Sequence, residues 1–176
     1  MKRVHLDRLA RAAEETASRK LDALVVSPSR DLAYLTGYDP MPLPRPTLLV
    51  LRPNRDPVML VPQLERALAA ASPVGEHLEL VPWRDGSDPY EAAASLLTGA
   101  DRIAVADRLW ATHLLGLQRE LPGAAFSSGS PVMGRLRAVK DEHELGALRR
   151  AGRAADETFR QVVSMSFQGR NEEDVA

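Results

Sequence analysis

Side chains that could perform catalysis are scattered along this 176-residue chain. The chain has four histidines, His5, His77, His113 and His143. None of them lies at the His-x-x-x-His or Glu-x-x-His spacing that puts two metal ligands on one face of a helix. We therefore interpret each as a surface or capping residue.

Two other polar clusters have simpler explanations than catalysis. The Ser-Ser-Gly-Ser segment at 127–130 lacks the Gly-x-Ser-x-Gly spacing of a nucleophile elbow, and we expect it to cap a turn that begins at Pro131. The acidic segment 141–144 fits negative charge at the start of a helix. The chain has no cysteine, which excludes a thiolate nucleophile or thiolate metal ligand. We predict no catalytic residue and no metal site in these residues.

The least ordinary segment is the stretch 39–46, in which every second residue is proline. Proline lacks the N–H group that a strand needs for its ladder, so this stretch cannot be a central strand. We expect a stiff, projecting loop. Trp83 and Trp110 are more typical of core or interface anchors than of ligand platforms.

The elements around this loop follow an alternating order. Helical spacing of apolar residues predicts a helix at 3–19, and short apolar runs bounded by turn residues predict strands. Ser29 is positioned to cap a short helix that Gly37 ends, and Asp88 with Pro89 predicts another helix start. The predicted strands are 22–27, 46–51, 57–62, 76–83, 101–107 and 123–128, and the predicted helices between them include 63–71 (opened by Pro62), 87–97 and 109–121. Residues 46–62 form a hairpin. The order predicts a three-layer α/β/α domain with a mixed six-stranded sheet over residues 1–135.

A second region, 136–176, has a different character. Asp141 and Glu144 form a capping box for a helix of about 25 residues with an apolar stripe. We expect Gly169 to stop this helix, and Asn171 with Asp174 to cap another one. A helix start with no apolar face to bury suggests a fragment of a longer protein.

Composition excludes several functions. The net charge of −1 gives no electrostatic footprint for nucleic acid or for anionic lipid. No apolar run approaches the roughly 20 residues of a membrane span, and the N-terminus lacks the apolar core of a signal peptide. We expect a cytoplasmic protein with no nucleic-acid or membrane partner.

Several of these segments together resemble the creatinase/prolidase-type N-terminal domain of Xaa-Pro aminopeptidases and Xaa-Pro dipeptidases. The segment LDALVVSPSRDLAYLTGY (21–38) is similar to the strand, short helix and Tyr-Leu-Thr-Gly run of that family. PWRDGSDPYEAAASLL (82–97) is similar to its Trp-x-Asp stretch. The junction RLRAVKDEHELGALRRAGRAADETF (135–159) resembles its linker helix, and GRNEEDVA (169–176) resembles the start of its pita-bread catalytic domain. The residues that fall on the linker pattern are Arg137, Val139, Lys140, Glu144, Leu145, Leu148, Arg149 and Ala151.

The resemblance implies that the intact protein is a metallopeptidase that cleaves the bond before proline. It implies two divalent metal ions, expected to be manganese, whose ligands lie beyond the end of this sequence, so this chain itself carries no cofactor. The chain would supply dimerisation, as a homodimer, and closure of the active site over a proline-containing peptide. The matching loop is 38–46, and Tyr38, Arg45 and Trp83 are our candidates for contacting substrate or partner.

Two other interpretations remain open. A catalytically dead relative would use the same fold to bind a peptide or protein. A creatinase-type amidinohydrolase would share the fold without metal. The motifs of this chain do not separate these from a peptidase.

Overall fold

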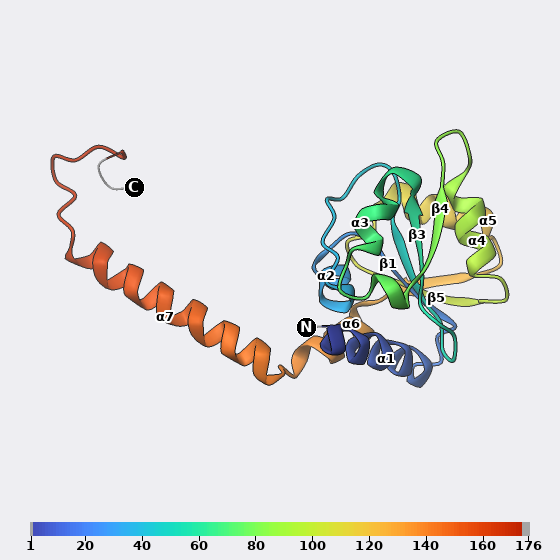
Figure 1. Cartoon of the computed structure of the whole chain (residues 1–176), viewed down its shortest axis with the longest axis horizontal. Helices are drawn as coiled ribbons and strands as arrows, with labels where there is room; N and C mark the ends of the chain where they lie inside the picture. Colours follow the sequence, from blue (N-terminus) through green and yellow to red (C-terminus); the bar gives the residue numbers. More distant parts are fainter. Residues whose placement is uncertain (1, 174–176) are drawn as a thin grey trace. The chain divides into compact units, whose positions relative to one another are not determined.

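The computed structural model describes residues 2–173 (Figure 1). The chain divides into two compact units, one ending at Arg137 and one beginning at Ala138. The first unit contains a six-stranded sheet with its covering helices, and the second contains one long helix.

The elements alternate in the predicted manner. The strands are β1 (Ala23–Val26), β2 (Leu48–Leu51), β3 (Val58–Pro62), β4 (Glu79–Trp83), β5 (Arg102–Val105) and β6 (Ala125–Ser128). The α-helices are α1 (Lys2–Ser18), α2 (Arg30–Thr36), α3 (Arg66–Ala70), α4 (Pro89–Leu96), α5 (Ala111–Glu120), α6 (Ser130–Ala138) and α7 (Glu142–Ser164), and short 3₁₀ helices lie at Gln63–Glu65 and Gly75–His77.

The sheet has the strand order β4-β3-β2-β1-β5-β6. β2 pairs antiparallel with both β1 and β3, whereas the pairs β1–β5, β3–β4 and β5–β6 are parallel. β2 therefore runs opposite to the other five strands. Their carboxyl ends and the entry into β2 share one edge of the sheet, which we call the carboxyl edge.

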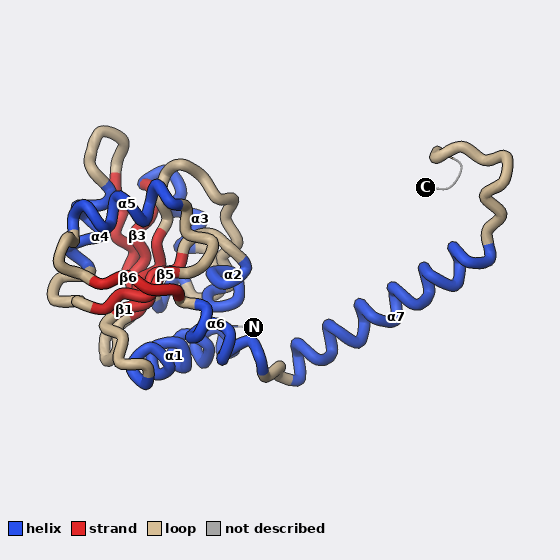
Figure 2. The backbone as a smooth tube through the Cα atoms, turned by 180° about the vertical axis from the view of Figure 1, so that it is seen from behind, coloured by secondary structure: helices blue, strands red, loops and turns tan. Residues whose placement is uncertain are grey.

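Two apolar cores lie on the two faces of this sheet. Alternation along β1 sends Leu24 and Val26 to one face, which α1, α2, α3 and α6 cover. Ala23 and Val25 point to the other face, which α4 and α5 cover. Figure 2 shows the strands between helices on both sides. The predicted three-layer α/β/α fold with a mixed six-stranded sheet is confirmed.

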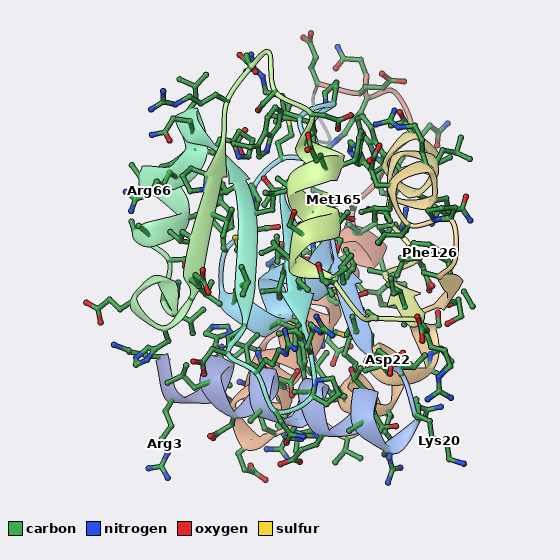
Figure 3. All side chains as sticks on the ribbon, turned by 90° about the vertical axis from the view of Figure 1, so that its right-hand side faces the viewer. Arg3, Lys20, Asp22, Arg66, Phe126 and Met165 are labelled. Atoms are coloured by element: carbon green, nitrogen blue, oxygen red, sulfur yellow. The ribbon has the colours of Figure 1, made fainter. Side chains whose placement is uncertain are left out.

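Local signals fixed several boundaries. The Ser29 hydroxyl accepts from the N–H of Leu32, and Gly37 ends α2 with φ 72° in the left-handed region, as predicted. The Asp88 carboxylate caps α4 through the N–H of Tyr90. The Asp22 side chain, labelled in Figure 3, accepts the N–H groups of residues 101 and 102 at 3.0 and 2.8 Å and so ties the start of β1 to β5.

Pro62 ends β3 opposite Trp83 of β4 and also stands at the start of the 3₁₀ helix Gln63–Glu65, which α3 follows, so the predicted helix start is confirmed. Two other local predictions were wrong. The fourth strand begins at Glu79 because a 3₁₀ turn occupies Gly75–His77. Residues 130–138 form the nine-residue helix α6 rather than a turn. Proline in the first helical turn removes only an N–H that would have no partner there, so Pro131 is compatible with this helix.

The second unit contains α7, whose capping box is confirmed. The Asp141 carboxylate accepts from the N–H of Glu144 at 2.8 Å, and the Glu144 carboxylate accepts from the N–H of Asp141 at 2.9 Å. The helix ends at Ser164, so Gly169 is not its stop. The predicted cap at Asp174 lies outside the described residues.

Candidate functional site

Three chain segments meet at the carboxyl edge of the sheet. The loop 38–46 enters β2 there, the segment 84–88 leaves β4, and the segment 106–110 leaves β5. In open α/β sheets, ligands bind outside the carboxyl ends of the strands. This edge is therefore where a functional surface of the fold is expected.

Arg45 and Trp83 both join loop 38–46 to the end of β4. A guanidinium nitrogen of Arg45 donates to Asp85 at 2.7 Å, and both side chains are about half exposed. The Trp83 indole N–H donates to the carbonyl of Pro46 at 2.9 Å. The Trp83 side chain is 8% exposed and packs in the core that α4 and α5 cover. Two predicted site residues thus lie where the loop meets the end of β4, with Arg45 at the surface and Trp83 beneath it.

Tyr38 lies at the other end of the same loop, next to α2. Its side chain is 8% exposed, and its hydroxyl has no hydrogen-bond partner among the described residues. Burial raises the pKa of the Tyr38 hydroxyl, and the nearby Glu65 carboxylate raises it further. A buried polar group without a partner costs about 1–3 kcal/mol, so this hydroxyl is an unusual feature of the fold.

A cleft of about 560 Å³ lies between this part of the loop and α3. Met41 and Leu43 of the loop and Leu68 of α3 line it, and all three are exposed. Tyr38 and Glu65 line it as well. The loop therefore presents an apolar wall with a carboxylate at its side.

α5 carries a buried histidine, His113, next to two aromatic side chains. This side chain is 4% exposed. Its Nδ1 lies 2.9 Å from the Tyr90 hydroxyl, and its ring stacks on Trp110 with centroids 5.7 Å apart and planes 3° apart. Burial lowers the pKa of His113, and the backbone of Leu43 opposes that shift.

Our interpretation of every histidine as a surface or capping residue was wrong for His113. His77 and His143 are exposed as expected, and His5 is partly buried. The sequence contained a signal for His113: Leu117, four residues later on the same helix, is fully buried, and residues four apart share a helix face.

A second, polar cleft of about 600 Å³ lies on the other side of the loop. Four of its charged side chains form two ion pairs: Arg30 donates to Asp39 at 2.6 Å and Arg137 donates to Asp31 at 2.8 Å. The cleft is lined by Pro28, Ser29, Arg30, Asp31, Asp39, Pro42, Asp107, Arg108, Trp110 and Arg137.

Serines of the 127–130 segment hold the Asp107 carboxylate in this cleft. The hydroxyl of Ser130 and that of Ser128, at 2.7 Å, both donate to it. These bonds, the one from Ser130 first, lower the pKa of Asp107. The Ser128 hydroxyl also accepts the N–H of Ser130, so this segment caps the start of α6.

The described residues do not fit a resident dinuclear metal centre. Within 2–173, no three histidine, aspartate or glutamate side chains gather where they could share an ion. In the same range, no helix combines the length and the apolarity of a membrane span.

Comparisons with known proteins place the chain among relatives. Residues 8–139 match the family model of the creatinase/prolidase N-terminal domain. The probable dipeptidase PepE of Mycobacterium tuberculosis is 40% identical over 175 residues, which are 98% of this chain and 46% of that protein. The chain thus spans about half the length of the curated relatives it matches.

Two solved structures of dipeptidases are also similar to this chain. The dipeptidase PepE from Mycobacterium ulcerans is 37% identical with a TM-score of 0.92, over 99% of this chain and 47% of that one. A proline dipeptidase structure from Streptococcus pneumoniae is 29% identical with a TM-score of 0.65, over 75% of this chain and 98% of that one. The second structure is thus a chain of about the size of the first unit described here.

Proposed function

The chain belongs to the creatinase/prolidase N-terminal domain family, found at the N-terminus of prolidase-like peptidases, and on this basis we propose that it serves a metal-dependent Xaa-Pro peptidase as a non-catalytic domain. Its tasks in this proposal are dimerisation as a homodimer and closure of the active site over a proline-containing peptide. Two divalent ions, manganese, would be bound by other parts of the whole protein. A chain without cysteine needs no oxidising compartment, which supports a cytoplasmic location.

The observation that carries this proposal is the way loop 38–46 is built. Proline at every second position from 40 to 46 stiffens it, and side-chain contacts from Arg30, Asp85 and Trp83 attach it to the domain. Despite these attachments it displays Met41, which is 75% exposed, and the half-exposed Arg45. A preorganised loop loses less conformational entropy when it docks, which suits a segment that closes over a ligand.

The names of the relatives favour a peptidase over one of the other two interpretations. Those reported above are called dipeptidases, and one of them is called a proline dipeptidase. These names favour peptide hydrolysis over the amidinohydrolase. A catalytically dead binding module is distinguished by activity of the whole protein.

The first experiment is kinetic and uses the full-length protein with a Xaa-Pro dipeptide. If Arg45 contacts the substrate carboxylate, Arg45→Ala should lower kcat/KM by one to two decades, since a charge-assisted hydrogen bond is worth about 1.5–3 kcal/mol. Asp85→Asn is the matched control, because it removes the ion pair and keeps the guanidinium. Exchange of Pro42 and Pro44 for glycine should produce a smaller loss through lost preorganisation.

The outcomes separate the roles of Arg45. If Asp85→Asn costs as much as Arg45→Ala, Arg45 acts only by holding the loop to β4. Unchanged kinetics for all variants would reduce the loop to a connector and refute active-site closure. Neither Arg45→Ala nor Asp85→Asn should change the free energy of unfolding by more than about 1 kcal/mol, because the Arg45–Asp85 ion pair is exposed.

Metal dependence and dimerisation need their own measurements. Removal of metal with a chelator should abolish dipeptide hydrolysis, and added Mn²⁺ should restore it. Light scattering of the full-length protein should give the mass of two chains. Activity that survives thorough chelation, or a monomeric mass, contradicts the corresponding part of the proposal.

A further inference from the structure

The polar cleft lies at the point of the sheet where two connections leave to opposite faces. After β1 the chain passes through α2, which packs on the face that α1, α3 and α6 also cover. After β5 it passes through α5, which packs on the other face. β1 and β5 are parallel neighbours, so these connections diverge between them at the carboxyl edge. Ligands of open α/β sheets bind at a switch point of this kind.

The segments that follow these two strands line the cleft. Residues 28–31 come directly after β1, and the segment 107–110 comes directly after β5. Asp39 and Pro42 of loop 38–46 line the cleft as well. A molecule bound in this cleft would therefore contact both the switch point of the sheet and the loop.

The charges of the cleft leave one acid and one base for a ligand. Six charged side chains line it, and four of them form the two ion pairs described above. The other two are Asp107 and Arg108. The Arg108 side chain is exposed and forms no ion pair with any residue between 2 and 173. A ligand that carries both a negative and a positive group would complement these two side chains.

The Asp107 carboxylate is held in a fixed orientation. Ser128 donates to one of its oxygens at 2.7 Å, and Ser130 donates to the other oxygen. These bonds, the one from Ser130 first, lower the pKa of Asp107, and the Arg108 charge adds to the shift, so the carboxylate is ionised near pH 7. Each carboxylate oxygen can accept two hydrogen bonds, so each has room for one more donor. An ammonium group suits these positions because it brings both donors and the opposite charge.

Trp110 gives the same cleft an apolar wall. Its ring stacks on the buried His113, with centroids 5.7 Å apart and planes 3° apart, and this contact fixes the plane of the indole. The Trp110 side chain is nevertheless 41% exposed and lines the cleft. Pro28 and Pro42 add further apolar surface. An aliphatic group can therefore pack beside the two charges.

We propose that the polar cleft binds a free α-amino acid with an aliphatic side chain. The carboxylate of the ligand pairs with Arg108, its ammonium group donates to Asp107, and its side chain packs on Trp110. In an α-amino acid one carbon separates the ammonium and carboxylate groups, which suits the charges of two consecutive residues that line one cleft. Guanidinium and carboxylate also match in shape, since two parallel N–H groups can donate to the two oxygens.

The proposed function suggests which amino acid binds. Hydrolysis of a Xaa-Pro dipeptide releases L-proline, so the cleft would bind a product of the whole protein. Because Asp39 and Pro42 line the cleft, the bound amino acid would contact loop 38–46 and hinder its closure. This regulatory role rests on the proposed function. The binding of the amino acid does not.

The first test is an NMR titration of the 176-residue chain with L-proline. Amide signals of residues 107–110 and the indole N–H signal of Trp110 should shift and saturate, with a Kd of about 1–10 mM for so small a ligand. N-acetyl-L-proline lacks the ammonium group, and L-prolinamide lacks the carboxylate. Each should bind about ten- to hundred-fold more weakly, because each loses one charge-assisted interaction. These ligands test the proposal without any change to the protein.

A substitution tests the residue that binds the carboxylate. Arg108→Gln should weaken the binding of L-proline about ten- to hundred-fold. Arg55→Gln is the matched control, because Arg55 is an exposed arginine in the turn between β2 and β3, at the opposite edge of the sheet. It should leave the Kd unchanged.

Three results would overturn the proposal. The first is the absence of saturable shifts at residues 107–110. The second is equal affinity for L-proline and N-acetyl-L-proline, which would indicate a site for anions only. The third is an equal loss of affinity in Arg108→Gln and Arg55→Gln, which would indicate a general effect of charge.

Kinetics of the full-length protein separate the regulatory role from the binding site. L-Proline added to a Xaa-Pro dipeptide assay should inhibit the parent more strongly than Arg108→Gln. If the chain binds L-proline and both proteins are inhibited equally, the site holds and its regulatory role fails. If the full-length protein does not hydrolyse the dipeptide, the proposed function fails and the titration still decides whether the site exists.

Discussion

Burial separates the histidines of this chain into two kinds. The Nδ1 of His113 lies 2.9 Å from the Tyr90 hydroxyl, and the Nδ1 of His5 lies 3.0 Å from the carbonyl of Tyr34. For both, desolvation is the largest influence and lowers the pKa from the ordinary value of 6.5. His77 is exposed in a 3₁₀ turn. A residue type alone therefore says little about its role, which depends on how much water the fold leaves around it.

This difference predicts the pH dependence of stability. A lowered pKa in the folded state means that the unfolded chain binds protons more readily below pH 6.5. The contribution of His5 and His113 to stability is fully present above pH 6.5, and it is lost as the pH falls through their folded-state pKa values. Urea unfolding midpoints should therefore be lower at about pH 5.5 than at about pH 7.5. Most of this difference should disappear in the double variant His5→Gln/His113→Gln, and a parent and variant with equal pH dependence would contradict it.

At the scale of single elements, α2 shows how a short helix is held at both ends. Ser29 caps its start, and Gly37 closes its end with a bond from its N–H to the carbonyl of Ala33 at 2.8 Å. The N–H of Tyr38 then bonds to the Thr36 hydroxyl at 3.0 Å. This turn fixes the direction in which loop 38–46 leaves the helix.

Gly37 should be more sensitive to substitution than Gly99, although both have nearly the same φ, 72° and 74°. Alanine at either position pays about 1–2 kcal/mol for the left-handed region. A Cβ at Gly37 would also lie 2.6 Å from Pro73, whereas a Cβ at Gly99 would meet no atom within 4 Å. Urea denaturation should therefore show that Gly37→Ala loses at least about 1 kcal/mol more than Gly99→Ala, since overpacking costs about 1–3 kcal/mol. Equal losses would mean that Pro73 moves aside without cost.

The apolar stripe of α7 predicts self-association of the 176-residue chain. Leu148 and Phe159 lie on this stripe, and within its own unit the helix buries no residue. Exposed apolar surface of this kind tends to find a partner. Light scattering should show a mass above that of a monomer for the parent, and a monomer for Leu148→Glu/Phe159→Glu. Gln161→Glu, at a polar position of the same helix, should behave as the parent. A monomeric parent would refute this prediction.

At the scale of the whole molecule, the sheet and the long helix belong to different units. The first unit has two apolar cores of its own, one on each face of the sheet. The Streptococcus pneumoniae structure, which matches three quarters of this chain over nearly its full length, supports a domain of this size. The polar side-chain contacts described in this unit join its loops, strands and helices to one another.

The 176-residue chain should therefore neither bind metal tightly nor hydrolyse peptides. Among the described residues no three candidate ligands come together, so calorimetry with Mn²⁺ or Co²⁺ should show no stoichiometric site. A Xaa-Pro dipeptide should remain intact in the presence of either ion. Saturable binding of two ions per chain would show that this domain holds the metal centre after all.

The sequence by itself determined the features that depend on neighbours a few positions away. The caps at Ser29, Asp88 and Asp141 and the glycine turn at Gly37 were predicted correctly. So was the alternation of strands and helices, since hydrophobic periodicity and capping are local effects. This order of elements supplied the fold class, and the resemblance of whole segments supplied the family.

Only the tertiary structure decided which distant residues meet. β1 lies between β2 and β5, Arg45 pairs with Asp85 forty positions later, and His113 is bonded to Tyr90. These contacts depend on strand order and on the space between packed side chains, such as the room that Gly116 leaves for Tyr90. Local periodicity contains no information on strand order or on that space. The sequence could therefore single out loop 38–46 by its prolines, but it could not show that Asp85 and Trp83 attach the loop to the end of β4.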